Sequence, residues 1–484
     1  MSEMNGNGKW PLPEGWVEVT LADVAHVERG ITFPASAKSS ELFGGGIACL
    51  RTTNVQEFVD WSDLIFVPEK YVRKEEKLTR PNDILISMAN SYELVGKVSF
   101  VDHVPVPSTF GGFIASIRTF ESISPKFLFY FLRNKETQSF LRRNSSQTVN
   151  IANISLHSLY PTPIPLPTLS QQHRIVAEIE KQFTRLDAAV AALKRAKANL
   201  GRYKSAVLKA AVEGRLVAQN PDDEPAAALL ARILTERRAQ WVAANPKKPY
   251  AEPKRPDVAG LPELPVGWVW ATVEEVGDSA EQPVLTGPFG SSLGRDDFIS
   301  QGVPLLTIGC LKETGITLDK AFYVSEEKAV ELDRYRVREG DILFSRMAAV
   351  GRAGYIPASL EGSLINYHLM RLRLNVQSIN PDYFIYYVRG SNAVESYIRE
   401  VNHGVTRDGI NTTQLLSLPV ALPPKFEQER IVEEVERILS VAQASEQVIY
   451  ANFARAERLR QGVLGKAFRG ELVTSGDSET SEVF

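Results

Sequence analysis

Cysteine and histidine are scarce in this chain of 484 residues, which contains two cysteines and six histidines. Cys49 and Cys310 stand in apolar, strand-like segments, so they predict buried thiols in a reducing compartment and exclude a disulfide framework. The histidines are scattered without metal-ligand spacing. The sequence therefore predicts no metal site.

Long apolar runs are missing as well. No stretch approaches the ~20 apolar residues that cross a bilayer, and the opening "MSEMNGNGKWPLPEGW" lacks the apolar run of a signal peptide. We expect a cytoplasmic protein without membrane segments. The net charge of −3 gives no overall signature of nucleic-acid binding, but it does not exclude such binding, because acidic and basic segments can offset each other.

Catalytic motifs are also lacking. The sequence has no G-x-G-x-x-G after a strand, no Walker loop and no adenine-methyltransferase motif. "GPFGSSLG" (287–294) is rich in glycine but lacks the Lys-Ser/Thr pair of a phosphate loop, which favours a turn-rich binding loop. The Glu-Glu-Lys fragments at 75–77 and 326–328 indicate solvated surface. We predict a binding protein with no catalytic residues.

What the chain does contain is a long duplicated segment. Leu166–Val217 and Leu422–Val473 align without a gap, with Arg174 matching Arg430. Each copy predicts one long helix. A glycine near the end of each copy, in "VEGRLV" and "FRGELV", predicts a helix C-cap, because glycine adopts the left-handed conformation at little cost.

Apolar residues recur in both copies at alternating steps of three and four, as in a coiled coil. The predicted seam consists of Val176, Ile179, Phe183, Leu186, Val190, Leu193, Leu200, Val432, Val435, Leu439, Ala442, Ile449, Phe453 and Ala456. Polar residues interrupt it at Lys197, Lys204, Glu446 and Arg460, and such residues usually fix register and partner. The first copy is basic toward its C-terminus and the second is acidic toward its N-terminus. Antiparallel pairing is therefore favoured over parallel pairing, and two separate surface helices are the alternative.

Shorter repeats precede each long helix. "LPEGW" and "LPVGW" open the two halves, "DILIS" and "DILFS" predict a shared strand, and Ser124-Pro125 and Asn380-Pro381 predict helix starts. Aromatic residues on those helices, such as Phe127 and Tyr383, favour core packing. We expect a mixed α/β (α+β) fold with a pseudo-two-fold internal repeat and this domain order: 1–165 first α/β domain, 166–217 first long helix, 218–263 short amphipathic helix and Pro/Lys linker, 264–421 second α/β domain, 422–473 second long helix, 474–484 disordered tail.

Two similar domains on a helical spacer fit an elongated ligand, of which double-stranded DNA is the obvious one. Polar and basic residues in the predicted loops are the candidate DNA contacts, since such donors suit phosphates and base edges. They are Lys38, Arg51, Asn90, Ser91, Lys97, Arg142, Arg143 and Gln147 in the first domain and Ser291, Ser292, Arg295, Arg346, Arg352, His403 and Arg407 in the second. The alternative is a non-catalytic scaffold or binding module with a coiled-coil spacer and no DNA specificity.

The duplicated helix starts and ends, the "LP.GW" openings, "TGPFGSSLG" and "NPDDEPA..LL.RI..ER" resemble the specificity subunit of type I restriction-modification enzymes, over nearly the whole chain. The resemblance implies two target recognition domains that read a split DNA sequence. It also implies two methyltransferase (modification) subunits and restriction subunits as partners. S-adenosylmethionine, ATP and magnesium are then expected on those partners and not on this chain. Because "GPFGSSLG" has no evident counterpart near residues 28–38, the two domains should read different half-sites.

Overall fold

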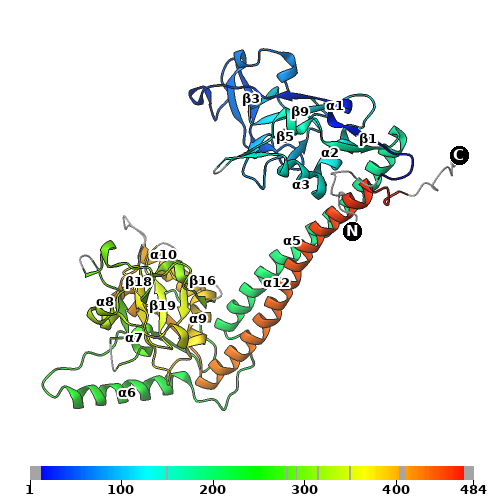
Figure 1. Cartoon of the computed structure of the whole chain (residues 1–484). Coiled ribbons are helices and arrows are strands. Elements are labelled where there is room, and N and C mark those ends of the chain that lie inside the picture. The colour runs from blue at the N-terminus through cyan, green and yellow to red at the C-terminus, as the bar shows by residue number, and fades with distance from the viewer. Residues whose placement is uncertain are drawn as a thin grey trace. The chain divides into compact units, whose positions relative to one another are not determined.

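The computed structural model describes residues 12–148, 151–279, 282–289, 292–312, 315–347, 350–402 and 409–473. They belong to two compact units: the first combines the chain up to Arg195 with the segment from Ile449 onward, and the second spans Ala196–Val448. Each unit thus contains one mixed α/β domain and part of both long helices (Figure 1). Within the described ranges, no helix is long and apolar enough to cross a membrane.

The first unit contains two main sheets, ordered β2-β9-β5-β7 and β4-β3-β8, together with a β1-β12 pair and a β10-β11-β6 ribbon. Its strands are β1 Val17–Thr20, β2 Ala25–Arg29, β3 Gly46–Leu50, β4 Ile65–Pro68, β5 Ile84–Ser87, β6 Ala89–Asn90, β7 Val98–Phe100, β8 Ser108–Phe110, β9 Ile114–Thr119, β10 Ser146–Gln147, β11 Ala152–Asn153 and β12 Pro163–Leu166. Its short helices are α1 Leu21–Val24, α2 Pro125–Arg133, α3 Lys135–Arg143 and α4 Leu156–Leu159.

Strand β5, the predicted "DILIS" strand, lies between two apolar layers. Successive side chains of a strand point to opposite faces of the sheet. Ile84 and Ile86 accordingly pack in a core with helix α2, whereas Leu85 packs in a second core with residues of β3 and β8. This explains why the strand is apolar without alternation. Helix α2 begins at Pro125, as predicted, and its Phe127 is fully buried.

The second unit repeats this plan, with sheets ordered β14-β22-β19-β20 and β18-β15-β21 and pairs β13-β23 and β16-β17. Its strands are β13 Val269–Thr272, β14 Val284–Thr286, β15 Val303–Leu306, β16 Leu311–Lys312, β17 Gly315–Ile316, β18 Phe322–Val324, β19 Ile342–Ser345, β20 Ala353–Tyr355, β21 Leu364–Ile365, β22 Leu369–Leu372 and β23 Pro419–Leu422. Its shorter helices are α6 Ala226–Ala244, α7 Val273–Val276, α8 Glu326–Glu331, α9 Pro381–Gly390, α10 Asn392–Asn402 and α11 Thr412–Leu416.

The equivalent strand β19 divides its side chains in the same way. Ile342 and Phe344 pack in one core with helix α9, and Leu343 packs in another. Tyr383 of α9 is fully buried, and its hydroxyl donates to the carbonyl oxygen of Ala421 at 2.7 Å. The predicted core role of this aromatic face is therefore confirmed.

The long helices are α5 Leu169–Val212 and α12 Lys425–Phe468. Each begins three residues after the boundary expected from sequence (166 and 422), because the preceding residues form strands β12 and β23, which pair with β1 and β13. Each also ends before the expected boundary (217 and 473). The predicted ranges therefore included a strand end at one side and the residues after the C-cap at the other.

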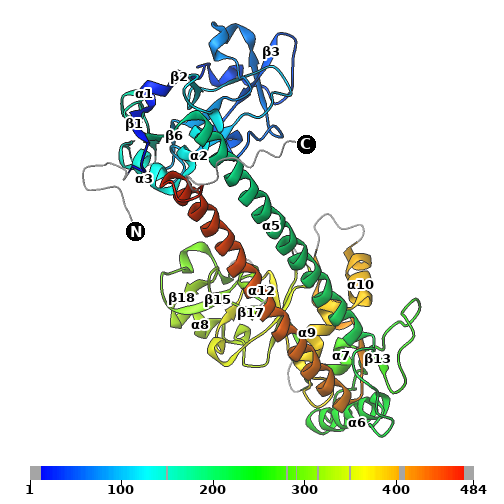
Figure 2. The same ribbon diagram turned by 90° about the vertical axis from the view of Figure 1, so that its right-hand side faces the viewer.

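Within each unit the parts of α5 and α12 run side by side and antiparallel (Figures 1 and 2). In the second unit, Lys204 Nζ donates to Glu446 Oε2 at 2.6 Å. In the first unit, the guanidinium of Arg460 contacts Asp187 and lies 4.9 Å from the ring centroid of Phe183. Two of the polar residues that interrupt the seam thus pair with each other across it. Antiparallel coiled-coil pairing, as expected from the charges, is confirmed.

The predicted seam residues are the less exposed positions of both helices. Buried are Val176, Ile179, Phe183, Val432, Val435, Ala442, Ile449 and Ala456, and half-buried are Leu186, Val190, Leu193, Leu200, Leu439 and Phe453. Burial is most complete where the helices meet the domain cores. Toward the middle of α5 the seam residues are only half-buried, whereas Ala442 and Ile449 near the middle of α12 are buried.

Both long helices end at the glycines that the sequence predicts as C-caps. Gly214 and Gly470 have φ of +66° and +72°. The amide of Arg215 donates to the carbonyl oxygen of Ala210 at 2.8 Å, which is the bond of a Schellman cap. Each capping glycine also lies against an "LP.GW" turn: a Cβ on Gly214 would approach Pro265 Cγ to 2.5 Å.

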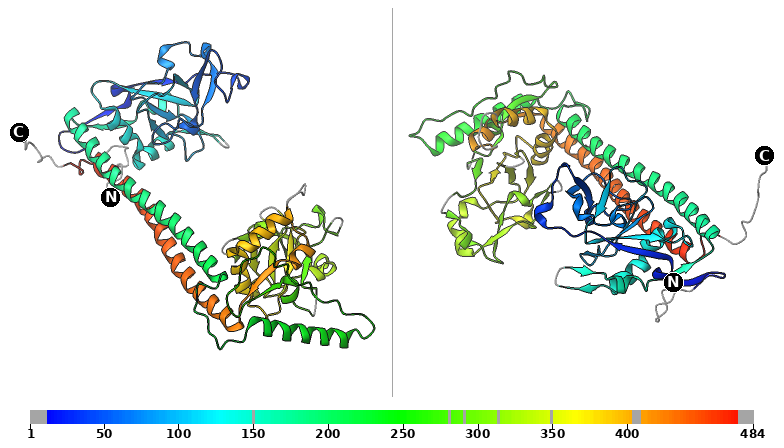
Figure 3. Two further views of the ribbon diagram at one scale, coloured as in Figure 1. Left: turned by 180° about the vertical axis from the view of Figure 1, so that it is seen from behind. Right: turned by 90° about the horizontal axis from the view of Figure 1, so that it is seen from above.

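Helix α6 follows the first long helix and contains the predicted amphipathic segment. Leu229, Leu230 and Ile233 are buried, and Figure 3 shows the helix outside the two sheets of the second unit. The segment before it is held by an ion pair between Asp223 and Arg430 of α12, at 2.7 Å. The tail expected at 474–484 lies outside the described residues.

Candidate nucleic-acid interface

The strand ends of the first domain carry a polar hairpin between β5 and β7. The amide of Ser87 donates to the carbonyl oxygen of Lys97, and that of Gly96 to Ser87, both at 2.9 Å. These bonds position Asn90 and Ser91 at the turn, where both side chains are half-buried. The Asn90 amide oxygen accepts from the backbone of Ser91 at 2.9 Å.

A three-stranded ribbon brings a second polar segment to this hairpin. Gln147 of β10 pairs with Ala152 of β11, which pairs with Asn90 of β6. Two residues predicted separately thus lie on one short ribbon. Asn153, which pairs with Ser146 on this ribbon, is exposed. It was not among the predicted contacts, because no strand was predicted at residues 152–153.

The basic candidates of the first domain differ in their surroundings. Lys38 and Arg143 are exposed. Arg142, in the last turn of α3, is half-buried, and its buried Nε has no hydrogen-bond partner in the described structure. None of these three side chains forms an ion pair with a carboxylate in the described part of the chain, so none would have to give one up to bind a phosphate.

Arg51 and Lys97 already have protein partners. Arg51 Nη2 donates to Asp63 Oδ2 at 2.6 Å. Lys97 Nζ donates to Gln56 Oε1 at 2.7 Å, and burial together with nearby Arg133 lowers the pKa of the Lys97 ammonium. Either side chain would exchange an existing contact for DNA, so both are weaker candidates than the exposed residues.

In the second domain, Arg346 and Arg352 flank the end of β19. The amide of Ser345 donates to the carbonyl oxygen of Arg352 at 2.8 Å, in the same position as the Ser87–Lys97 bond of the first domain. Arg352 is exposed and Arg346 half-buried. Ser292 and Arg295 are exposed on the loop between β14 and β15. Ser291, His403 and Arg407 lie outside the described residues.

The expectation that "GPFGSSLG" has no counterpart near residues 28–38 is wrong at the level of the backbone. Gly287 and Gly30 occupy the same place in the two domains: their amides donate to the carbonyl oxygens of Leu369 and Ile114. A Cβ on either glycine would lie within 2.6 Å of a neighbouring carbonyl oxygen. Sequence comparison missed this because only the glycine is shared.

Aromatic residues at the loop tips were also missed. Phe113 is 69% exposed, Phe289 55% and Tyr367 43%. Phe113 lies in the turn between β8 and β9, and Tyr367 lies in the turn between β21 and β22. A glycine pair and an Asn-Tyr-His sequence were the available signals for a turn.

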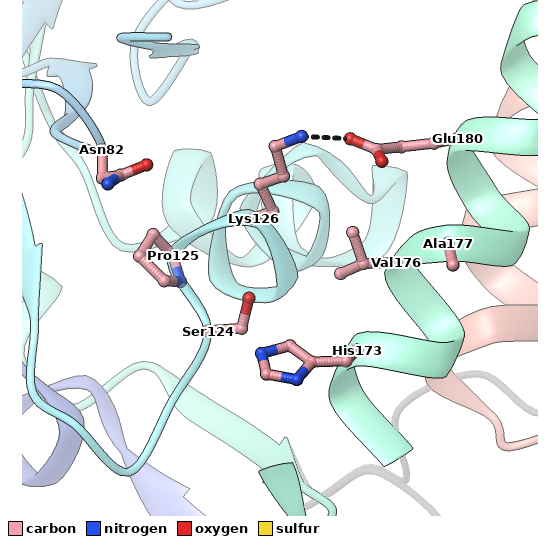
Figure 4. Close-up of a pocket in the computed structure, with 8 residues that line it drawn as sticks. All are labelled: Asn82, Ser124, Pro125, Lys126, His173, Val176, Ala177 and Glu180. Carbon is pink, nitrogen blue, oxygen red and sulfur yellow. Dashed lines mark hydrogen bonds and ion pairs between the residues drawn. The ribbon is translucent and has the colours of Figure 1, made fainter. Parts of the chain in front are cut away.

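A hollow of about 350 Å³ lies between the start of α2 and the first turns of α5 (Figure 4). His173 and Val176 of α5 face Ser124 and Lys126 across it, and Lys126 Nζ donates to Glu180 Oε1 at 2.6 Å. The lining contains this ion pair between two helices. Among the residues drawn in Figure 4, no nucleophilic side chain is hydrogen-bonded to a general base. We interpret it as a surface groove of the helix junction.

Neither metal nor thiol chemistry is evident in the described part of the chain. No group of three or more His, Cys, Asp or Glu residues is placed to hold a metal ion there. Cys49 and Cys310 are buried and unpaired, as predicted, and burial raises the pKa of the Cys49 thiol to about 12. A thiol with so high a pKa is not a nucleophile at neutral pH.

Comparison with known proteins decides the family. The model of the type I restriction modification DNA specificity domain matches residues 13–197 and 292–450. The chain belongs to this family. The matched segments include all the candidate residues except Ser291, and most of both long helices.

Relatives of the specificity family match over almost the full chain. The EcoKI type I restriction enzyme specificity subunit of Escherichia coli (strain K12) is 27% identical over 98% of this chain and 92% of its own length. The StySPI specificity subunit of Salmonella potsdam is also 27% identical, with the same coverage. A solved chain of a type I R-M system, 20% identical, superposes with a TM-score of 0.63 over 96% of this chain and 100% of its own, which supports the fold.

Proposed function

We propose that this specificity subunit reads a split DNA sequence, with each domain contacting one half-site through its strand-end loops. The observation that carries the proposal is the repeated backbone frame with different side chains. Ser87 and Ser345 hold the same hairpin in both domains, yet Met88 follows the first serine and Arg346 the second. Two domains with the same backbone frame but different side chains at the loop tips are suited to read two half-sites of different sequence, because the side chains select the bases.

The charges of these loops and of the adjoining end of α3 support contact with a polyanion. Lys38, Arg295 and Arg352 are exposed on loops, although the whole chain has a net charge of −3. Arg143 is also exposed, but it lies in the last turn of α3 and not in the loop predicted from the sequence. Basic residues that gather on loops can bind DNA despite an acidic total, because phosphate contacts are local and are screened within about 10 Å. Affinity should therefore fall steeply with added salt.

We further propose that the chain is non-catalytic and acts in the cytoplasm with partners. The two long helices are copies of each other, so their outer faces present two similar docking surfaces. Each surface would accept one modification subunit, which gives a ratio of two modification subunits to one specificity subunit, joined by restriction subunits. S-adenosylmethionine, ATP and magnesium would bind to these partners. Native mass spectrometry with one modification subunit bound at saturation would contradict the two-surface proposal.

The experiment that tests DNA reading is selection of bound duplexes from a random pool by the chain in complex with its modification subunits. We expect two short motifs separated by a gap of fixed length. Binding measured from 50 to 200 mM salt should weaken by orders of magnitude if several phosphates are contacted. Binding without sequence preference, or with no salt dependence, would favour the alternative of a scaffold with a coiled-coil spacer.

A further inference from the structure

Three side chains of the second domain gather beside the end of strand β19. Phe289 follows β14, Arg346 follows β19, and Tyr367 lies in the turn between β21 and β22. The guanidinium carbon of Arg346 lies 5.0 Å from the ring centroid of Phe289, and the centroids of Phe289 and Tyr367 are 6.0 Å apart. We call these three residues the Arg346 cluster.

Backbone contacts join the three loops. Gly287 approaches the turn at Asn366 so closely that a Cβ on it would lie 2.4 Å from the Asn366 carbonyl carbon. The amide of Arg346 donates to the carbonyl oxygen of His368 at 2.9 Å. The loops thus have backbone contacts besides those between the two rings, and both rings remain about half exposed. Exposed aromatic rings beside an arginine are typical of a binding surface.

The guanidinium of Arg346 is fixed in direction as well as in place. Its Nε donates to the carbonyl oxygen of Ile410 at 3.3 Å, and one of its faces rests on Phe289. The two terminal amino groups are then the edge that remains for a ligand. Burial and the neighbouring arginine lower the pKa of the His368 imidazole, which is therefore neutral at pH 7. Arg346 thus supplies the positive charge at this point.

The first domain has the same frame without the cluster. Its corresponding backbone bond joins the amide of Met88 to the carbonyl oxygen of Phe113, at 2.8 Å. Counting from Gly30 and from this bond, Thr32, Met88 and Gly112 take the places of the phenylalanine, arginine and tyrosine. The cluster is therefore a property of one domain and not of the repeated scaffold.

We propose that Arg346, supported by Phe289 and Tyr367, reads a guanine in the half-site of the second domain. Arginine contacts O6 and N7 of guanine with two parallel hydrogen bonds, which is the commonest specific contact in the major groove. A planar guanidinium that is already stacked loses little freedom on binding, so the contact discriminates strongly. This inference rests on the proposed function and names one residue and one base within it.

The test is the selection experiment above, with the full chain in complex with its modification subunits. Arg346→Ala should reduce one guanine preference in one half-site by about tenfold or more and leave the other half-site unchanged. Phe289→Ala should weaken the same position to a smaller degree, because it removes the support and keeps the fork. The matched control is Arg334→Ala, which removes an exposed arginine that is also stacked on a ring, with its guanidinium carbon 5.1 Å from the Tyr335 centroid. It should alter no base preference.

Three results would overturn the inference. First, the guanine preference could survive in Arg346→Ala. Second, the position whose preference is lost in the variant could be one at which the parent prefers a base other than guanine. Third, Arg346→Ala could weaken binding equally for all sequences, which would indicate a phosphate contact or a structural role. Each of these would leave the bipartite motif of the parent intact. If the parent itself selects no bipartite motif, the proposed function fails first. The two failures are therefore distinguishable.

Discussion

Alanine in place of either capping glycine should lower the free energy of unfolding, whereas alanine in place of a glycine inside the same long helices should raise it. Gly214→Ala places a Cβ on a residue with φ of +66°, which costs about 1–2 kcal/mol for an L-residue. The new atom would also meet Pro265 Cγ at 2.5 Å and Trp268 at 3.2 Å. Overpacking adds about 1–3 kcal/mol, unless the turn at Pro265 shifts. We expect the second unit to lose roughly 2–5 kcal/mol.

Gly201 and Gly462 provide the matched controls. Both lie inside long helices, are exposed, and would place a Cβ in open space. Alanine at either position should stabilise its helix by about 0.5–1 kcal/mol, because glycine is the poorer helix former. Gly470→Ala should destabilise the first unit in the same way as Gly214→Ala does the second, since its Cβ would meet Pro13 at 2.8 Å.

The assay is chemical unfolding followed by circular dichroism and tryptophan fluorescence. Trp268 and Trp16 lie next to the two caps and contribute to the fluorescence of the six tryptophans, while circular dichroism reports the helices. If Gly214→Ala and Gly201→Ala shift the midpoint in the same direction, the reasoning is refuted. Equal midpoints for parent and Gly214→Ala would mean that the cap and the turn against it contribute no net stability.

Other predictions concern charges of the second unit. Asp341→Ala should cost about 3–5 kcal/mol in urea unfolding, because it leaves Arg373 buried without the carboxylate that it contacts at 2.8 Å; a loss below 1 kcal/mol would contradict this. Burial raises the pKa of Glu427 above its ordinary 4.5, so its stabilising contribution is full below about pH 4.5 and is lost as pH rises through the raised value. Glu427→Gln should therefore raise the melting temperature at pH 7 and not at pH 4. A double-mutant cycle on Lys204 and Glu446 should give a coupling free energy of at most about 1 kcal/mol that falls with added salt, because both side chains are about one-third exposed. A coupling free energy that does not change with salt would argue against a solvent-screened pair.

Much of the fold could be predicted from the sequence because the chain contains an internal repeat. A single "DILIS" segment indicates a strand only weakly, but its return as "DILFS" ahead of another helix start makes a shared frame the simpler account. Charge segregation between the helix copies was enough to predict their antiparallel pairing. Glycines at the ends of both copies predicted the caps, since the left-handed conformation has few other occupants.

Buried polar contacts were not accessible in the same way. Gln172 and Gln428 are fully buried, and each accepts a hydrogen bond at 2.7 Å from the backbone at the start of α2 or α9. Glutamine is usually exposed, so its type indicates surface and not core. Only the three-dimensional packing of a long helix against a domain shows that the side chain satisfies backbone groups at this junction.

The candidate site shows why loop residues were harder to select than elements. Arg51 and Arg346 have the same side chain in predicted loops, and from sequence they were equal candidates. Arg51 donates to Asp63 within its own domain, whereas Arg346 is stacked on the exposed ring of Phe289. The difference arises from residues distant in sequence: Asp63 in one case, Phe289 and Ile410 in the other. Base readout depends on how a side chain is aimed, and in this chain the aiming groups lie on other loops.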